Sequence, residues 1–380
     1  MQRNRPPFRA DHVGSLLRPA ALKEARAQRE RGEIGASELK AVEDREIKAV
    51  IAKQEDVGLQ AVTDGEFRRA FWHIDFLERL DGVESYKGER KIKFKGEQPK
   101  PILVRVVGKL GNFAGHPMLE HFRFLKEHAR RMPKMTIPSP SALHYPYGRS
   151  AVPEAIYPDM DDFFGDLATT YGNAVRAFAD AGCRYLQLDE VNFAYLCDPE
   201  QRQQVRERGD DPETLPQIYA DVINAAIADI PPDMTITMHL CRGNFRSNFV
   251  ASGGYDPVAD VLFNRIKVHA YFMEYDTERA GGFEPLRLVP RDKTVVLGLV
   301  TSKSGTLESR DMLKRRIEEA TKFIDIDQLC LSPQCGFSST EEGNVLTEEA
   351  QWEKLWMIVE VAEEVWGKPA ASRSAVAADR

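Results

Sequence analysis

The sequence has few cysteines and no long apolar run. Only 5 of its 380 residues are cysteine, an odd number and too few for the disulfide framework of a secreted domain. No run of about 18 apolar residues appears, so there is no candidate transmembrane helix. The N-terminal "MQRNRPPFRADHVGS" lacks the apolar segment and cleavage site of a signal peptide. We therefore expect a cytoplasmic protein that does not act in a membrane.

The sequence also lacks an excess of positive charge. Its net charge is −7 and its isoelectric point is about 5.8, and no basic patch is interleaved with aromatic residues. A surface that holds a nucleic-acid backbone needs such an excess, so nucleic acid is not an expected partner. With 42% hydrophobic and 29% charged residues the chain is typical of a folded globular protein.

No internal repeat and no Pro-rich or Gly/Ser-rich linker divides the chain. We therefore predict one catalytic domain over residues 1–367. The final "KPAASRSAVAADR" is rich in small and polar residues, so residues 368–380 are predicted to form a flexible tail.

Short apolar runs alternate with segments of helical spacing along the chain. The predicted strands are 8–14, 59–64, 134–139, 183–189, 234–240, 267–274, 294–300 and 328–333. Helical spacing is found over 19–31, 37–57, 69–79, 160–181, 212–229, 255–264, 309–323 and 347–366. Eight strands that alternate with helices predict an α/β fold, a (β/α)8 TIM barrel.

Residues 84–112 interrupt this alternation. They mix charged and apolar residues in the manner of an antiparallel hairpin inserted after the second strand. The hairpin could cover a site or form a contact in a homo-oligomer, and the sequence leaves both open.

The barrel hypothesis places active-site residues at the C-terminal ends of the strands. Polar and ionisable residues do collect there. They are His12 and Ser15, Asp64 and Glu66, His144 and Tyr145, Asp189 and Glu190, His239 and Cys241, Glu274 and Asp276, Lys303, and Cys335.

The stretch "TITMHLCRGN" suggests part of a metal site. Residues two apart in a strand point to the same side, so His239 and Cys241 can face one point. Glu274 and Cys335 lie at the ends of the sixth and eighth predicted strands. Two thiolates, one imidazole and one carboxylate suit Zn2+.

Alternatively, His239 and Cys241 stand two residues apart by chance and bind no metal. A buried cysteine often behaves as a small hydrophobic residue, and Cys183, Cys197 and Cys330 are predicted to be of that kind. Spacing alone leaves both interpretations open. The collection of ligand types at one end of the barrel favours the metal site.

The motifs "HVGS", "DGEF", "LQLDE", "MHLCRGN", "YFMEYD" and "LSPQCG" occur in this order. As a set they resemble the C-terminal catalytic barrel of cobalamin-independent methionine synthase, in a superfamily that also contains uroporphyrinogen decarboxylase. The resemblance covers about residues 8 to 366. It implies a zinc enzyme that activates the thiol of homocysteine for attack on the methyl group of a methylfolate.

The resemblance also implies roles for individual residues. It assigns the zinc ligands to His239, Cys241, Glu274 and Cys335. It further implies that Ser15, Glu66 and Asp189 hold the amino and carboxylate groups of the amino acid, although Glu66 could instead pair with a neighbouring arginine.

The sequence departs from the family in two places. There is no room for the second, N-terminal barrel that helps to bind the folate tail. Lys303 stands where the family has a histidine thought to assist protonation of the leaving group, and it could be an acid, an anion anchor or a surface charge. Tyr145, with Tyr147, could stack against a flat donor or simply pack.

These departures leave several functions open. The first is transfer of methyl from a methylfolate or another donor to homocysteine. Relatives with one barrel suggest two variants, a methionine synthase whose donor is a corrinoid protein and an enzyme like epoxyalkane:coenzyme M transferase. A metal-free lyase like uroporphyrinogen decarboxylase is a further alternative, which the complete ligand set disfavours.

Overall fold

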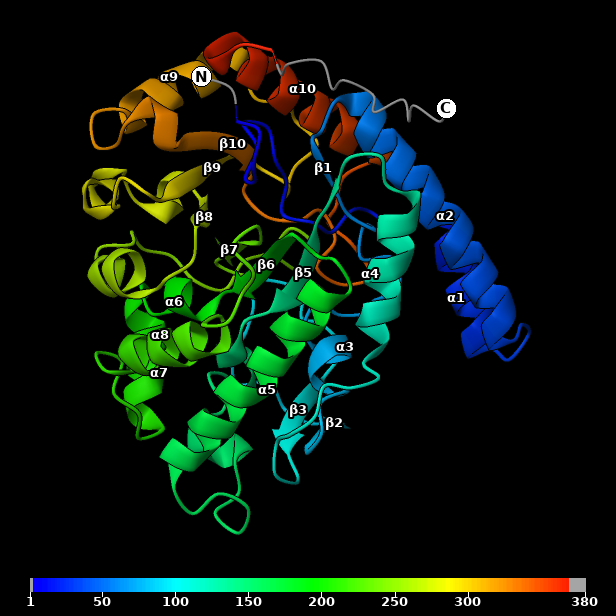
Figure 1. Ribbon diagram of the computed structural model, residues 1–380, viewed down its shortest axis with the longest axis vertical. Helices are drawn as coiled ribbons and strands as arrows, with labels where there is room; N and C mark the ends of the chain where they lie inside the picture. Colours follow the sequence, from blue (N-terminus) through cyan, green and yellow to red (C-terminus); the bar gives the residue numbers. More distant parts are fainter. Residues whose placement is uncertain (1–2, 369–380) are drawn as a thin grey trace, which may run out of the picture.

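The computed structural model describes residues 3–368, and its centre is a parallel β-sheet surrounded by helices (Figure 1). Six parallel strands pair in the order β10-β9-β8-β7-β6-β5. They are β5 (Met135–Pro138), β6 (Tyr185–Glu190), β7 (Thr235–Leu240), β8 (Ala270–Glu274), β9 (Thr294–Val300) and β10 (Leu329–Pro333). Nearly every residue in them is buried, as expected for parallel strands that are covered on both faces.

Two further segments close this sheet into an arrangement of TIM-barrel type. The strand β1 (Ala61–Val62) pairs in parallel with β4 (Met132–Pro133), and only one residue separates β4 from β5. At the other edge, Ala10 forms a parallel bridge to Leu331 of β10. The N–H of Leu16 donates to the carbonyl of Gly65 at 3.0 Å. The N-terminal segment therefore lies between β10 and β1.

The N-terminal segment is not the regular strand predicted for residues 8–14. Within it only Ala10 forms a β-bridge. The carboxylate of Asp11 accepts hydrogen bonds from the backbone N–H groups of Phe8 and His12, at 3.1 and 2.8 Å. These donors are satisfied locally and do not pair with a neighbouring strand, which explains the difference.

An antiparallel pair of strands occupies most of the segment predicted as a hairpin. It consists of β2 (Val83–Lys87) and β3 (Ile102–Val106). The pair lies beside the short helix α3 (Ile74–Leu77), off the main sheet (Figure 1). The connection over residues 88–101, called the 88–101 loop below, extends toward the loop that follows β7.

The helices cover the outside of the barrel (Figure 1). The longer ones are α1 (Ala20–Glu30), α2 (Ala36–Val57), α4 (Pro117–His128), α5 (Met160–Asp180), α7 (Pro199–Glu207), α8 (Leu215–Ala226), α9 (Arg310–Ala320) and α10 (Glu348–Trp366). Short helical turns are α6 (Asn192–Tyr195), η1 (Pro140–Leu143), η2 (Gly148–Ala151), η3 (Val261–Arg265), η4 (Glu278–Ala280), η5 (Glu284–Leu288) and η6 (Ile326–Gln328).

Four helical segments differ from prediction. The predicted helix 69–79 is reduced to α3, and 255–264 to the single turn η3 that ends at Arg265. The helices α7 and α4 were not predicted, although the signals of α4 are present. Pro117 stands at its start, the His116 ring accepts a hydrogen bond from the N–H of Met118 at 3.2 Å, and Phe122 and Leu125 are buried.

The interior of the barrel is filled by side chains from several strands. Tyr185, Phe272, Val296 and Cys330 pack together there. None of the helices within residues 3–368 combines the length and apolar character that crossing a lipid bilayer requires. Apart from residue 368, the predicted tail lies outside the described residues.

Candidate functional site

The ends of two strands bring a histidine and two cysteines together. His239 belongs to β7, Cys241 follows that strand, and Cys335 follows β10. One nitrogen of the histidine and the two sulfurs all lie within 4.8 Å of one another. The two Sγ atoms are 3.3 Å apart, and all three residues are buried. The three residues offer the ligand atoms for one metal ion.

The chemistry of this group fits a metal such as zinc. Within residues 3–368 neither ring nitrogen of His239 has a hydrogen-bond partner, although both are buried. Leaving such atoms unpaired is costly, whereas a metal ion would use one of them. The neighbouring Cys335 thiol and burial together raise the pKa of Cys241 well above its usual range. A divalent cation would reverse that effect, since it favours the thiolate.

Glu274, the fourth predicted ligand, lies outside the group of three. It ends β8 and is fully buried, and its carboxylate accepts from the guanidinium of Arg279 and, at 2.8 Å, from the N–H of Arg242. Burial alone would raise the pKa of Glu274, but the positive charges of Lys303, Arg279 and Arg242 outweigh burial and lower it. The carboxylate is therefore charged and paired with arginine.

A pocket joins the His239, Cys241 and Cys335 group to the predicted substrate residues. Its volume is about 460 Å³, including space open to solvent, and it is also lined by Ser15, Glu66 and Asp189. We call it the thiol-side pocket, defined by these six residues. The carboxyl ends of parallel strands meet on one face of the sheet, which is why residues so distant in the sequence converge here.

One carboxylate oxygen of Glu66 has no hydrogen-bond partner in the part of the chain that the structure describes. Its backbone has φ of 61°, a left-handed conformation, and its N–H donates to Asp64 at 2.8 Å. Its Oε1 accepts from the hydroxyl of Thr136 at 2.7 Å and lies 3.5 Å from Arg69, whereas Oε2 is buried and unpaired. The neighbouring arginine that the sequence offered as an alternative partner of Glu66 is therefore Arg69, whereas the guanidinium of Arg68 pairs with carboxylates on α2.

Asp189 is the second carboxylate of the pocket. Its Oδ1 accepts from the side-chain amide of Gln187 at 2.7 Å. Burial, and then the negative charge of Glu66, raises the pKa of Asp189 to about 7. Two buried carboxylates that repel each other would both be stabilised by a cation bound between them.

Ser15 lies against the loop after β10. Its hydroxyl accepts a hydrogen bond from the N–H of Ser338 at 3.4 Å, and its carbonyl accepts one from Phe337 at 2.9 Å. Gly336 allows this approach, since a Cβ there would lie 1.9 Å from the Ser15 hydroxyl. The Ser15 side chain, which lines the pocket, is thus held by a backbone N–H of this loop.

Besides Glu274, two further sequence candidates, Lys303 and Tyr145, do not line the thiol-side pocket. The Lys303 ammonium donates to the carbonyl of Gly243 at 3.2 Å and to the side chain of Asn244 at 3.1 Å. Tyr145 lies behind Tyr195, with 5.9 Å between their ring centres, and Tyr195 faces the pocket. The tyrosine that lines the thiol-side pocket is therefore Tyr195 and not the predicted Tyr145.

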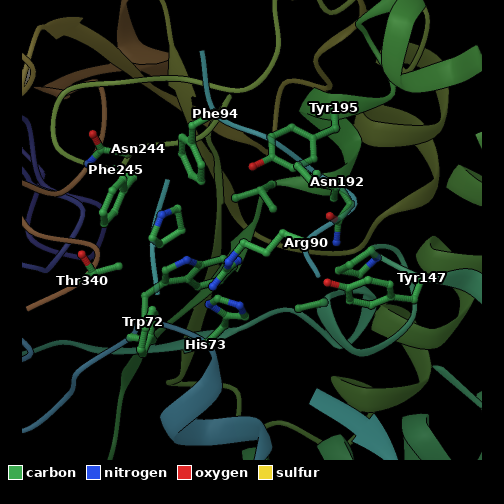
Figure 2. Close-up of a pocket in the computed structure, with 16 residues that line it drawn as sticks. Trp72, His73, Arg90, Phe94, Tyr147, Asn192, Tyr195, Asn244, Phe245 and Thr340 are labelled. Carbon is green, nitrogen blue, oxygen red and sulfur yellow. The ribbon is translucent and has the colours of Figure 1, made fainter. Parts of the chain in front are cut away.

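A second pocket adjoins the first, and of its residues the sequence had offered only Tyr147 as a stacking residue. It is lined in part by Trp72, His73, Arg90, Tyr147 and Phe245 (Figure 2). Trp72, Phe94, Val191, Tyr195 and Asn244 line both pockets. The aromatic runs "AFWH", after "DGEFRR", and "NFAY", after "LDEV", follow predicted strand ends. They were a usable signal for the missed residues, whereas nothing local to the 88–101 loop indicated where it would pack.

Comparison with known proteins identifies the family. Residues 8–364 match the family model described as "Cobalamin-independent synthase, Catalytic domain". The chain is 51% identical over 367 residues to the uncharacterized protein YxjH of Bacillus subtilis, covering 96% of each chain. It is 24% identical over 326 residues to a methionine synthase of Pyrococcus abyssi, covering 85% of this chain and 84% of that one.

Solved structures agree. A putative vitamin-B12 independent methionine synthase from Listeria monocytogenes has a TM-score of 0.78 and 43% identity, with 96% of this chain and 100% of that chain covered. A B12-independent methionine synthase from Shewanella sp. W3-18-1, solved with selenomethionine, shares the fold with a TM-score of 0.69 at 20% identity, covering 94% and 97%. The chain therefore belongs to the family of cobalamin-independent synthase catalytic domains.

Proposed function

We propose that the protein is a zinc-dependent enzyme that transfers a methyl group to the thiol of homocysteine. The observation that carries the proposal is the thiol-side pocket, where a His, Cys, Cys group and two carboxylates face one space. The names of the Pyrococcus and Shewanella relatives, as methionine synthases, support the same reaction.

His239, Cys241 and Cys335 would hold the zinc ion, and Glu274 would be a fourth ligand if it left its ion pair with Arg279. Zinc, when bound, lowers the pKa of an acceptor thiol so that the nucleophilic thiolate is the form present at neutral pH. The chain's own cysteines supply soft donors, which suits an ion that must also accept the sulfur of a substrate.

The two carboxylates and the serine would orient the amino acid. Asp189 and Glu66 would bind its ammonium group, which also relieves their mutual repulsion. Ser15, which lines the pocket, would bind its carboxylate together with nearby backbone. Held at that end, the acceptor sulfur would form a bond to the donor's methyl carbon. The bond from that carbon to the donor breaks, its electron pair stays on the donor, and the donor then takes a proton.

We propose that Lys303 positions the loop after β7 and does not supply that proton. Its ammonium is engaged by Gly243 and Asn244, and it lines neither pocket. Lys303→Met should lower the free energy of unfolding by about 1 kcal/mol, since two charged hydrogen bonds are lost. It should reduce kcat by less than about tenfold and leave the pH profile unchanged, whereas removal of a general acid costs 10²–10⁴-fold.

Denaturant unfolding measures the stability of Lys303→Met, and kcat as a function of pH measures its catalysis. Lys303→Arg is the matched control, because it keeps the charge and can keep both hydrogen bonds. A fall of kcat beyond a hundredfold with an altered pH profile would restore Lys303 as the proton donor.

The alternative of a metal-free lyase has less support. It leaves unexplained why two cysteines and a histidine with no hydrogen-bond partner converge in the pocket. The variants that use another alkyl donor or another thiol acceptor keep the same chemistry, the alkylation of a thiol.

The proposed function is tested by metal analysis and X-ray absorption at the zinc edge, before and after addition of L-homocysteine. We expect one zinc per chain and a new sulfur neighbour once homocysteine is present. Absence of zinc, or a zinc whose neighbours do not change with any thiol, would contradict the proposal.

A further inference from the structure

Glu274 points into the barrel from its place on β8. Phe272 packs inside the barrel and lies opposite His239 of β7. Residues two apart in a strand point to the same side, so Glu274 and Cys241, each two residues after that pair, face the interior as well. Neighbouring strands are about 4.8 Å apart. The Glu274 side chain therefore starts next to Cys241, on the side where a metal ion would bind.

Arg279 is the side chain that pairs with the Glu274 carboxylate. Its Nη2 donates to Oε1 of Glu274, which is fully buried. The guanidinium of Arg242 is engaged differently, since it donates to backbone carbonyls that include those of Gly253 and Ala280. Only the backbone N–H of Arg242 donates to the Glu274 carboxylate, at 2.8 Å. A metal ion that takes this carboxylate would therefore have to take it from Arg279.

The loop after β7 fixes Arg279 in place. Its Nη1 donates to the carbonyl of Ala251 at 3.3 Å, and its guanidinium carbon lies 4.4 Å from the centre of the Phe249 ring. Its own carbonyl accepts a hydrogen bond from the N–H of Gly253 at 2.9 Å. Only 12% of the Arg279 side chain is exposed. We therefore expect the guanidinium to stay where it is when the Glu274 carboxylate moves.

A second carboxylate is available to Arg279. Asp276 is buried, and its Oδ1 lies 3.7 Å from the same Nη2 atom that donates to Glu274. If Glu274 moved to a metal ion, Asp276 would remain as the counterion of Arg279. A buried guanidinium without a counterion is costly, so this second partner lowers the free energy needed to release Glu274.

We propose that Arg279 is a positioning residue that competes with the metal ion for the carboxylate of Glu274, with Asp276 as its alternative counterion. A zinc ion held by three side chains accepts a fourth ligand. The competition keeps that position exchangeable, because the Glu274 carboxylate can return to Arg279 when a thiol binds there as thiolate and releases its proton to the solvent. The identity of the metal and of the thiol rests on the proposed function, but the competition can be measured without methyl transfer.

The first test is the zinc affinity of four proteins, which are the wild type, Arg279→Met, Glu274→Gln and the chain with both substitutions. Competition with a fluorescent zinc chelator measures it. We expect Arg279→Met to bind zinc at least about tenfold more tightly than the wild type, because the carboxylate is then available to the metal. With Glu274→Gln already present, the same substitution should change the affinity by less than about threefold, which is the effect of losing a nearby positive charge alone.

The second test is the affinity of the zinc-loaded proteins for L-homocysteine, measured by calorimetry. Arg279→Met should bind it at least about tenfold more weakly, because the displaced carboxylate no longer has Arg279 to return to. Opposite changes of the two affinities distinguish competition from a purely structural role, loss of which would weaken both. Asp276→Asn removes the alternative counterion and should act in reverse, with weaker zinc and tighter homocysteine binding. It decides the question if Arg279→Met does not fold.

The matched control is Arg202→Met. Arg202 is buried to a similar degree and also pairs with one carboxylate, that of Glu213, and one carbonyl, that of Leu196, but it lies on α7 and lines neither pocket. Both affinities should stay within about twofold of the wild type. A zinc affinity that Arg279→Met does not raise, an equal rise with and without Glu274→Gln, or a parallel loss of both affinities overturns the inference and leaves the proposed function standing. Absence of zinc binding by the wild type overturns both.

Discussion

Cys335→Ser should lose zinc and methyl transfer while the barrel stays folded. The hydroxyl of serine is a hard, weakly acidic ligand, so the group would keep one thiolate where it had two. We expect zinc affinity to fall by more than about 100-fold. Loss of a residue that only hydrogen-bonds to a metal ligand already costs about 10- to 100-fold, and Cys335 is proposed as a ligand itself. Metal analysis after dialysis, a transfer assay and circular dichroism measure the three quantities.

Cys183→Ser is the matched control for that experiment. Cys183 is also buried, but it precedes β6, and its thiol donates to the carbonyl of Tyr185 at 3.3 Å, a bond that a serine hydroxyl can keep. The control should retain zinc and activity. Full zinc retention and normal turnover in Cys335→Ser would contradict the assignment of this cysteine as a ligand.

Asp189→Asn should impair binding of the amino-acid acceptor without loss of zinc. The variant removes one of the two carboxylates available to the ammonium and leaves the His239, Cys241 and Cys335 group unchanged. We expect the KM for homocysteine to rise about 100-fold, equivalent to about 3 kcal/mol for a buried charge pair. A thiol that lacks the ammonium, such as 3-mercaptopropionate, should be affected much less, and an equal loss for both thiols would refute ammonium binding.

The same substitution should stabilise the metal-free protein above neutral pH. The pKa of Asp189 is raised to about 7 from 3.8, so between about pH 4 and pH 7 the folded state holds a proton that the unfolded state has lost. Stability from this group is therefore present at low pH and is lost as the pH rises through about 7. An asparagine side chain does not titrate, so the variant has no such dependence from this position.

At pH 8, in the absence of metal, Asp189→Asn should unfold at higher denaturant concentration than the wild type, by about 1–2 kcal/mol. Near pH 4 the two proteins should differ little. Guanidinium unfolding at both pH values measures this change. A variant that is less stable than the wild type at pH 8 would show that burial and Glu66 do not destabilise the charged form of Asp189.

The strands of the barrel could be predicted because each is a short apolar run flanked by polar residues. The run "QLCLSP" became β10 and "TVVLGLV" became β9. Parallel topology then sends the residues after each strand to one face, so the convergence of His239, Cys241 and Cys335 followed from their positions alone. Ser15, Glu66 and Asp189 converge on the same pocket for the same reason.

The path of the loops could not be predicted. Tyr145 and Tyr195 both follow strands, but only the packing of α6 decides that Tyr195 faces the pocket. Glu274 was correctly placed at the end of a strand, yet its carboxylate pairs with Arg279, five residues later, and is not part of the group of His239 and the two cysteines. No periodicity in the sequence indicates that Tyr195 lines the pocket or that Glu274 pairs with Arg279.

The sequence by itself determined the α/β architecture of this protein and the chemical types gathered at one end of it, because burial and strand period are local properties of the chain. Only the tertiary structure decided that the N-terminal segment closes the sheet through a single bridge and that the 88–101 loop places Arg90 beside the thiol-side pocket. The reason is physical: these features depend on contacts between segments that are distant in sequence, and no local pattern encodes which distant surface a loop will meet.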